Sequence, residues 1–308
     1  MSINIPGSGI WVPGTDMLVN GGLLVNQRQQ TSYRVPHNTY TVDRWKSNLD
    51  AQIDVVSDGI KVHSLGNVYA GIWQHSENMY VQSGDTYTFS VDFPETPVPG
   101  WYIDLHMVPV TEGNPGVTAS TVGKNLQKGI NAVTATVPNG INGLYYFRGF
   151  ICNALAEDTV AHIHRAKLEP GPISTLMYDA PPDMAVEEAR CKRYFERLGN
   201  AQSGKLTNWT YIPQGSAQAI FSIAYSAKRV VPTVALSAPD QYRVLLRESA
   251  TGNIFRAPTV IALATNEVSK TTATVTAAIG TTDRPAHGML QRTDVATSAW
   301  INIDAEIH

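Results

Sequence analysis

The feature that most constrains this sequence is an alternation of apolar and polar residues that recurs between Leu23 and Leu168. In the segment YTFSVDF, residues 87–93, aromatic and aliphatic residues fall on one face of an extended chain, and hydroxyl and carboxyl residues fall on the other. Runs of this kind are short and are separated by Gly, Asn, Asp and Pro. Many strands with turn residues at regular spacing are typical of a β-sandwich or jelly roll.

A helix is predicted to interrupt the strands between Asp183 and Gly199. Asp183 is a favourable N-cap after two prolines, acidic residues follow in the first turns, and Gly199 ends the helix. Helical spacing brings several residues onto one face, which we expect to pack against a neighbouring element. The residues predicted on this face are Met184, Cys191, Phe195 and Leu198.

Strand-like runs return after this helix, with Phe221, Ile223 and Tyr225 on one face of one run. In another run, Ile301, Ile303, Ala305 and Ile307 share a face. The predicted fold class is therefore all-β: a jelly-roll or β-sandwich domain, a connecting α-helix and a second, smaller β-sandwich domain. The predicted segments are a docking arm (1–20), the jelly roll (21–178), the linker helix (179–200) and the C-terminal sandwich (201–308).

The arm is inferred from apolar residues in a segment otherwise rich in Gly and Pro. A solvated tail would not need Ile5, Ile10 and Trp11, so we expect these residues to dock on another protein. The start of the chain resembles no secretory signal and no run is long enough to span a membrane, so a soluble product of the cytoplasm is predicted.

Composition excludes several functional classes. A net charge of -3 provides no global field for nucleic acid. The two cysteines form no framework of disulfides and no CxxC motif. No phosphate-binding, dinucleotide-binding or hydrolase motif is present, so no cofactor and no catalytic residues are predicted.

Two strand-like segments place polar residues at alternate positions. Asp104 and His106 share one face of IDLHM, and His162 and His164 share one face of AHIHR. Imidazoles at such spacing can bind a metal, but alternation alone also requires polar residues on the solvent face of a half-buried sheet. The second interpretation is favoured, and no metal site is predicted.

Aromatic residues near these polar residues suggest a sugar site. A flat ring can stack on the apolar face of a sugar while polar neighbours bind its hydroxyls, although aromatic residues are also common in sheet cores. Trp101 is predicted to be the most sensitive position. The candidate glycan-binding residues are Trp73, Trp101, Tyr102, Asp104, His106, His162 and His164.

Several motifs together resemble a module found in structural proteins of tailed phages. NQRQQTS (26–32) is followed by YTVDRW (40–45), and AKLEPGPIST (166–175) is similar to the closing strand of that module. EEARCKRYFERL (187–198) resembles the helix that follows, although STLMYD (174–179) replaces the usual Thr-Pro-Phe. The resemblance implies a carbohydrate-binding-module-like jelly roll in a virion and no catalytic residues.

From this resemblance we expect a non-enzymatic virion appendage, such as a tail fibre, receptor-binding protein or head spike, that attaches the particle to host-surface polysaccharide. The arm would contact other virion proteins, and a homo-oligomer, most simply a trimer, would cover the neutral faces of the sandwiches. The alternative is a purely structural decoration or adaptor protein that binds no glycan. A depolymerase would need a pair of acidic residues across a groove, which the sequence does not indicate.

Overall fold

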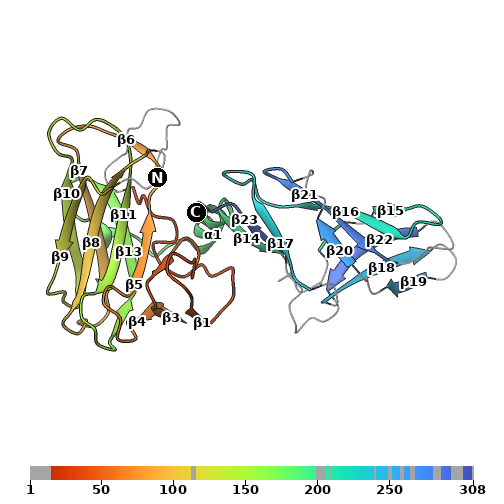
Figure 1. Ribbon diagram of the computed structural model, residues 1–308, viewed down its shortest axis with the longest axis horizontal. Helices are drawn as coiled ribbons and strands as arrows, with labels where there is room; N and C mark the ends of the chain where they lie inside the picture. Colours follow the sequence, from red (N-terminus) through yellow and green to blue (C-terminus); the bar gives the residue numbers. More distant parts are fainter. Residues whose placement is uncertain are drawn as a thin grey trace. The chain divides into compact units, whose positions relative to one another are not determined.

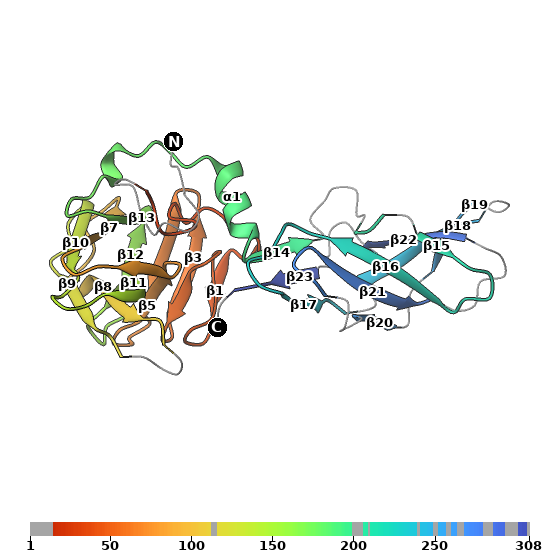
Figure 2. The same ribbon diagram turned by 90° about the horizontal axis from the view of Figure 1, so that it is seen from above.

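The computed structural model describes residues 15–111, 116–198, 206–208, 210–238, 241–248, 252–256, 260–263, 268–279, 286–292 and 301–306. The chain forms two compact units, residues 1–188 and 189–308, each described by itself. Almost all regular structure is β-strand, and one α-helix, α1 (Met184–Lys192), occurs in the described residues (Figures 1 and 2). The all-β fold class is confirmed.

The described residues of the first unit form three antiparallel sheets. The first has the order β1 (Ser32–Arg34), β3 (Gln52–Val56), β4 (Gly59–His63) and β12 (Val160–Ile163). The second has the order β10 (Gly129–Thr136), β7 (Thr86–Phe93) and β13 (Arg165–Pro170). The third has the order β2 (Lys46–Asn48), β5 (Gly71–His75), β11 (Gly143–Asn153), β8 (Trp101–Pro109) and β9 (Ala119–Gly123), with β6 (Met79–Val81) also paired to β11.

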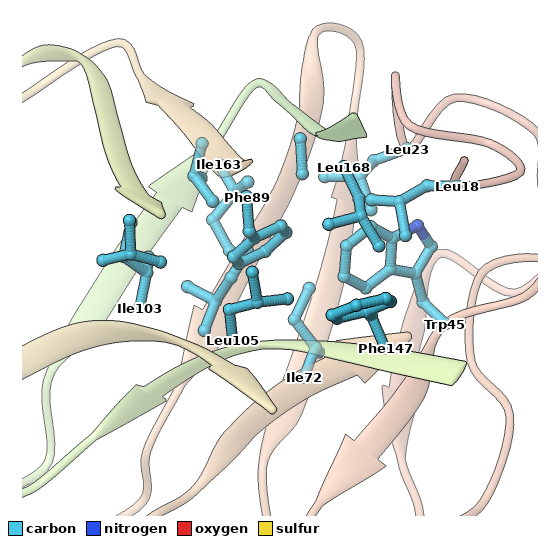
Figure 3. Close-up of a cluster of buried hydrophobic side chains, with 14 of the residues drawn as sticks. Leu18, Leu23, Trp45, Ile72, Phe89, Ile103, Leu105, Phe147, Ile163 and Leu168 are labelled. Carbon is cyan, nitrogen blue, oxygen red and sulfur yellow. The ribbon is translucent and has the colours of Figure 1, made fainter. Parts of the chain in front are cut away.

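One continuous core joins these sheets. Buried residues of all three meet in it, as Figure 3 shows for Phe89 of β7, Leu105 of β8 and Ile163 of β12. Gly149 of β11 allows the Phe89 ring to approach closely, because a Cβ there would lie 2.6 Å from that ring. The predicted alternation of β7 is confirmed, since Tyr87, Phe89, Val91 and Phe93 are all buried in this core.

Part of the predicted docking arm belongs to this unit. Met17 and Leu18 are buried in the core cluster, and the amide of Met17 donates to the carbonyl of Leu168 at 2.7 Å. The amide of Val19 donates to the Gln74 side chain at 2.8 Å. Ile5, Ile10 and Trp11, which carry the docking prediction, lie outside the described residues.

The motif residues of YTVDRW hold the chain around this core. Asp43 is buried, and its carboxylate accepts from the backbone N–H of Gln27 at 3.2 Å, from Gln27 Nε2 at 2.6 Å and from Arg28 Nη1 at 3.3 Å. The Trp45 indole is fully buried and donates to the carbonyl of Asn20 at 3.0 Å. This motif therefore connects the first strands to the preceding segment.

The motif AKLEPGPIST forms a second buried polar network. Lys167 Nζ lies 3.5 Å from Glu169 Oε2 and 2.7 Å from Asp179 Oδ2. The Glu169 carboxylate also accepts from the amide and the hydroxyl of Thr175, at 2.7 and 2.6 Å. These contacts fix the segment that leads to the short 3-10 helix η1 (Leu176–Tyr178) against β13.

The helix α1 is shorter than predicted. Asp183 Oδ1 accepts from the amides of Ala185 and Val186 at 2.9 and 3.4 Å, which confirms the predicted N-cap. The prediction that the helix reaches Leu198 is wrong, because residues 195–198 form strand β14 (Phe195–Leu198), which pairs with β23 (Ile301–Asp304). The predicted apolar face is also wrong at Met184, which is 44% exposed.

In the second unit, the part of the chain that the structure describes forms three short antiparallel sheets. Their orders are β14, β23 and β17 (Thr233–Leu236); β15 (Thr210–Ile212), β22 (Ala286–Arg292), β18 (Tyr242–Glu248) and β19 (Gly252–Arg256); and β16 (Gln218–Ala224), β21 (Thr272–Ala278) and β20 (Val260–Leu263). A second core includes Phe221, Ile223 and Tyr225, as predicted, together with Ile301 and Ile303. Ala305 is also buried, and Ile307 lies outside the described residues.

Candidate functional site

The third sheet of the first unit has one face in the core and one face turned away from it. Residues directly opposite each other in an antiparallel pair point to the same side of the sheet. Phe147, Gly149 and Ile151 of β11 lie on the core side, so the residues between them lie on the outer side. We call this outer side the aromatic face; it comprises Lys46, Trp73, His75, Tyr102, Asp104, His106, Tyr146, Arg148 and Phe150.

Rings on three neighbouring strands of the aromatic face are in contact. The Trp73 and Phe150 rings are stacked, with centroids 5.7 Å apart and planes inclined by 24°. On the far side of Phe150, the His106 ring lies 4.7 Å away, centroid to centroid. His75 and Tyr146 make an edge contact at 5.8 Å. The strands β5, β11 and β8 therefore present a connected row of rings.

Two cations lie against these rings. Lys46 Nζ is 5.2 Å from the Trp73 ring centroid, and Arg148 Cζ is 5.6 Å from the same centroid. Arg148 Nη2 also donates to the Tyr146 hydroxyl at 2.6 Å. Cation–π contacts of this kind hold long side chains in a defined orientation.

A carboxylate and an imidazole form a pair on β8. Asp104 Oδ2 lies 2.7 Å from His106 Nε2, and Asp104 Oδ1 accepts from the Ser120 hydroxyl of β9 at 2.9 Å. A carboxylate only accepts, so His106 carries a proton on Nε2, and in the neutral imidazole Nδ1 is then an acceptor. Asp104 thus orients His106 and fixes which of its nitrogen atoms faces a further partner.

Three polar atoms of the aromatic face are buried and have no hydrogen-bond partner among the described residues. They are Trp73 Nε1, His106 Nδ1 and Arg148 Nε. Trp73 as a whole is only 8% exposed. Buried polar groups are almost always paired, and an unpaired one costs free energy, so three together suit a surface that binds a polar ligand.

Burial changes the protonation behaviour of this face. It lowers the pKa of His75 to about 3, with a further contribution from the positive charge of Arg44. It also raises the pKa of Tyr102, and it raises the pKa of the neighbouring Cys152 thiol to about 12. At neutral pH, His75 is therefore uncharged and Cys152 is a thiol rather than a reactive thiolate.

The structure brings together four of the seven predicted glycan-binding residues. Trp73, Tyr102, Asp104 and His106 all lie on the aromatic face. Trp101 does not: it is 2% exposed in the core, and its indole donates to the Thr159 hydroxyl at 3.0 Å. Stacking of Trp101 on a sugar is incompatible with this burial, which corrects the prediction that it is the most sensitive position.

His162 and His164 lie elsewhere. His162 is on β12 of the first sheet, between the core residues Ala161 and Ile163, and its Nε2 is 3.2 Å from Asp58 Oδ1. His164 follows β12, and its Nδ1 lies 3.2 Å from Asp92 Oδ2. Both imidazoles therefore lie next to carboxylates away from the aromatic face, although His162 Nε2 makes no hydrogen bond among the described residues.

Sequence reasoning did not select Lys46, His75, Arg148 or Phe150. The signal for His75, Arg148 and Phe150 is the alternation within GIWQH and YYFRGF, where every second residue is aromatic or cationic, and Lys46 lies outside both segments. That signal becomes informative only with the strand pairing, since β5 and β8 are joined through β11, which follows both in the sequence.

Among the described residues, no three His, Cys, Asp or Glu side chains are grouped so that they could hold a metal ion. In the same residues, no helix has the length and hydropathy of a membrane span.

No protein-family profile matches the chain, and no curated protein matches it. Similar solved structures include a family 4 carbohydrate-binding module, 13% identical over 50% of this chain and 100% of that one, with a TM-score of 0.29. A xylan-binding CBM22 module from Paenibacillus barcinonensis is 16% identical over 42% of this chain and 94% of that one, with a TM-score of 0.29. A tandem of two CBM22 modules from the same source is 7% identical over 95% of this chain and 96% of that one, with a TM-score of 0.31. These likenesses are too distant to indicate what this chain binds.

Proposed function

We propose that this protein binds carbohydrate through the aromatic face of its first unit. The observation that carries the proposal is the combination of three unpaired polar atoms with a row of rings on the same sheet face. A sugar offers both matching surfaces, because its C–H faces pack on rings while its hydroxyls donate and accept.

The polar atoms have the mixed character that hydroxyl groups require. Trp73 Nε1 and Arg148 Nε are donors, and His106, whose Nε2 faces Asp104, presents Nδ1. Asp104 orients His106 through a hydrogen bond, and the Tyr146 hydroxyl orients Arg148 in the same way. A site whose polar groups are already oriented loses less conformational entropy on binding.

We further propose that the protein acts as a non-enzymatic virion appendage, displayed on the particle and attached to host-surface polysaccharide. The support is the resemblance of the motifs around residues 26–45 and 166–198 to phage structural modules. A homo-oligomer, with a trimer as the simplest form, and contacts of the N-terminal arm with other virion proteins remain part of this proposal.

A structural role in the virion without glycan binding is the second candidate. It is favoured by large apolar side chains exposed after the closing strand, where Ile173 is 74% exposed, Met177 62% and Tyr178 78%. Apolar residues gathered in this way are common at contacts between proteins.

Binding of the purified protein to a panel of bacterial surface polysaccharides tests the proposal. We expect binding without release of reducing sugar, and a loss of affinity in Trp73→Phe, which keeps a ring but removes the indole donor. Trp101→Phe is the matched control, since that indole donates inside the core and its loss affects stability but not affinity. Absence of binding to every polysaccharide would favour the structural role, and sugar release would indicate an enzyme.

A further inference from the structure

Two cationic side chains of the aromatic face lie against one ring. Lys46 on β2 and Arg148 on β11 flank Trp73 on β5, with Nζ and Cζ at 5.2 and 5.6 Å from its ring centroid. Both cations are therefore placed beside the same indole, one from each neighbouring strand. Asp104 is the single acidic side chain in the set of residues that defines this face.

Asp104 does not pair with Arg148. Its two oxygens are engaged by His106, at 2.7 Å, and by the Ser120 hydroxyl, at 2.9 Å. Arg148 donates through Nη2 to the neutral Tyr146 hydroxyl, and within the part of the chain that the structure describes it forms no ion pair. Its Nε–H remains buried without a partner among those residues. A shielded guanidinium of this kind is favourably paired by an anion.

The surroundings of His75 agree with this description. After burial, the causes that lower its pKa are the positive charges of Arg44, Lys46 and Arg148. The charges of Arg44, Lys46 and Arg148 therefore act on His75, which is itself uncharged at neutral pH.

We propose that the ligand of the aromatic face is an acidic glycan, whose sugar carboxylate pairs with Arg148 beside Trp73. The inference rests on the proposed function, which it narrows to polysaccharides that contain uronic acids or similar carboxylated sugars. Arg148 Nε and Trp73 Nε1 supply single N–H groups that a carboxylate can accept from, while the rings contact the sugar itself.

The test compares acidic bacterial polysaccharides with their carboxyl-reduced forms, which keep the same sugar chain but lack the charge. Binding by isothermal titration calorimetry should weaken by about tenfold or more on reduction, because a hydrogen bond to a charged group is lost. Arg148→Gln should lose the preference for the acidic form, and Arg34→Gln, an exposed position on β1 of another sheet, should keep it. Arg148→Lys, which retains the charge, should keep part of it.

The outcomes separate this inference from the proposed function. Equal binding to the acidic and the reduced forms would overturn the inference that the ligand is acidic, but it would leave the proposal of glycan binding intact. Binding confined to phosphate-bearing polymers would overturn the inference that a sugar carboxylate pairs with Arg148. Binding to none of the polysaccharides would overturn the proposed function itself. The wild-type comparison holds even if Arg148→Gln fails to fold.

Discussion

Trp73 and Phe150 stack with their ring centroids 5.7 Å apart on neighbouring strands of one sheet face. On the core side of the same two strands, Ile72 and Ile151 are fully buried. The Trp73–Phe150 pair lies outside the core cluster to which Ile72 and Ile151 belong, so packing in that core does not explain it. Binding of a ligand supplies an explanation.

His106 and His164 should differ in their effect on binding. Both are strand-region histidines paired with an aspartate, at 2.7 and 3.2 Å, but only His106 lies on the aromatic face. We expect His106→Ala to weaken polysaccharide binding by about tenfold, since one oriented acceptor is lost, and His164→Ala to leave it unchanged. Titration calorimetry on the two variants gives the comparison. Equal losses would show that binding does not occur on the aromatic face.

Asp43 is expected to be a stability residue. Its buried carboxylate accepts from Gln27 and from the charged Arg28, so Asp43→Ala removes these hydrogen bonds and should cost about 3 kcal/mol of unfolding free energy. Asp50→Ala, at an exposed position in the same unit, should change stability by less than about 0.5 kcal/mol. Urea unfolding measures both values. Similar stability of the two variants would contradict a structural role for the YTVDRW motif.

Asp183 and Phe195 should contribute unequally to stability. Asp183→Ala removes the cap of α1 and is expected to cost about 1 kcal/mol. Phe195→Ala creates a cavity where β14 pairs with β23, because Phe195 is 2% exposed, and is expected to cost about 3 kcal/mol or more. Thermal unfolding ranks the two variants. A smaller effect for Phe195→Ala would show that β14 is misplaced.

His75 should make stability depend on pH in the acidic range. Its pKa is lowered from 6.5 to about 3 in the folded protein, so between these values the unfolded chain binds a proton that the folded protein does not. Stability is therefore complete above pH 6.5 and decreases as pH falls toward 3. In His75→Gln, the unfolding free energy should change less steeply with pH, and the difference in slope should correspond to up to about one bound proton. Denaturant unfolding from about pH 7 to about pH 4 tests it, and identical pH profiles would refute it.

The sequence predicted the all-β class and the core alternation because period 2 is a local property, as in Tyr87 and Phe89 of β7. The position of Trp101 was also accessible, since it shares its parity with the core residues Ile103 and Leu105. Strand pairing could not be predicted from the sequence, so His162 and His106 could not be assigned to different sheets. Residues 195–198 were predicted to be helical because the strand that pairs with them, β23, lies about a hundred residues later.

The indole N–H signals of the tryptophans test the central claim most directly. In ¹H–¹⁵N NMR spectra, assigned with Trp73→Phe, titration with a bound oligosaccharide should shift the Trp73 indole signal, because this N–H gains an acceptor. The signals of Trp45 and Trp101 should stay in place, because their indoles already donate to Asn20 and Thr159 in the core. Saturation with oligosaccharide that leaves the Trp73 signal unchanged would contradict binding at the aromatic face.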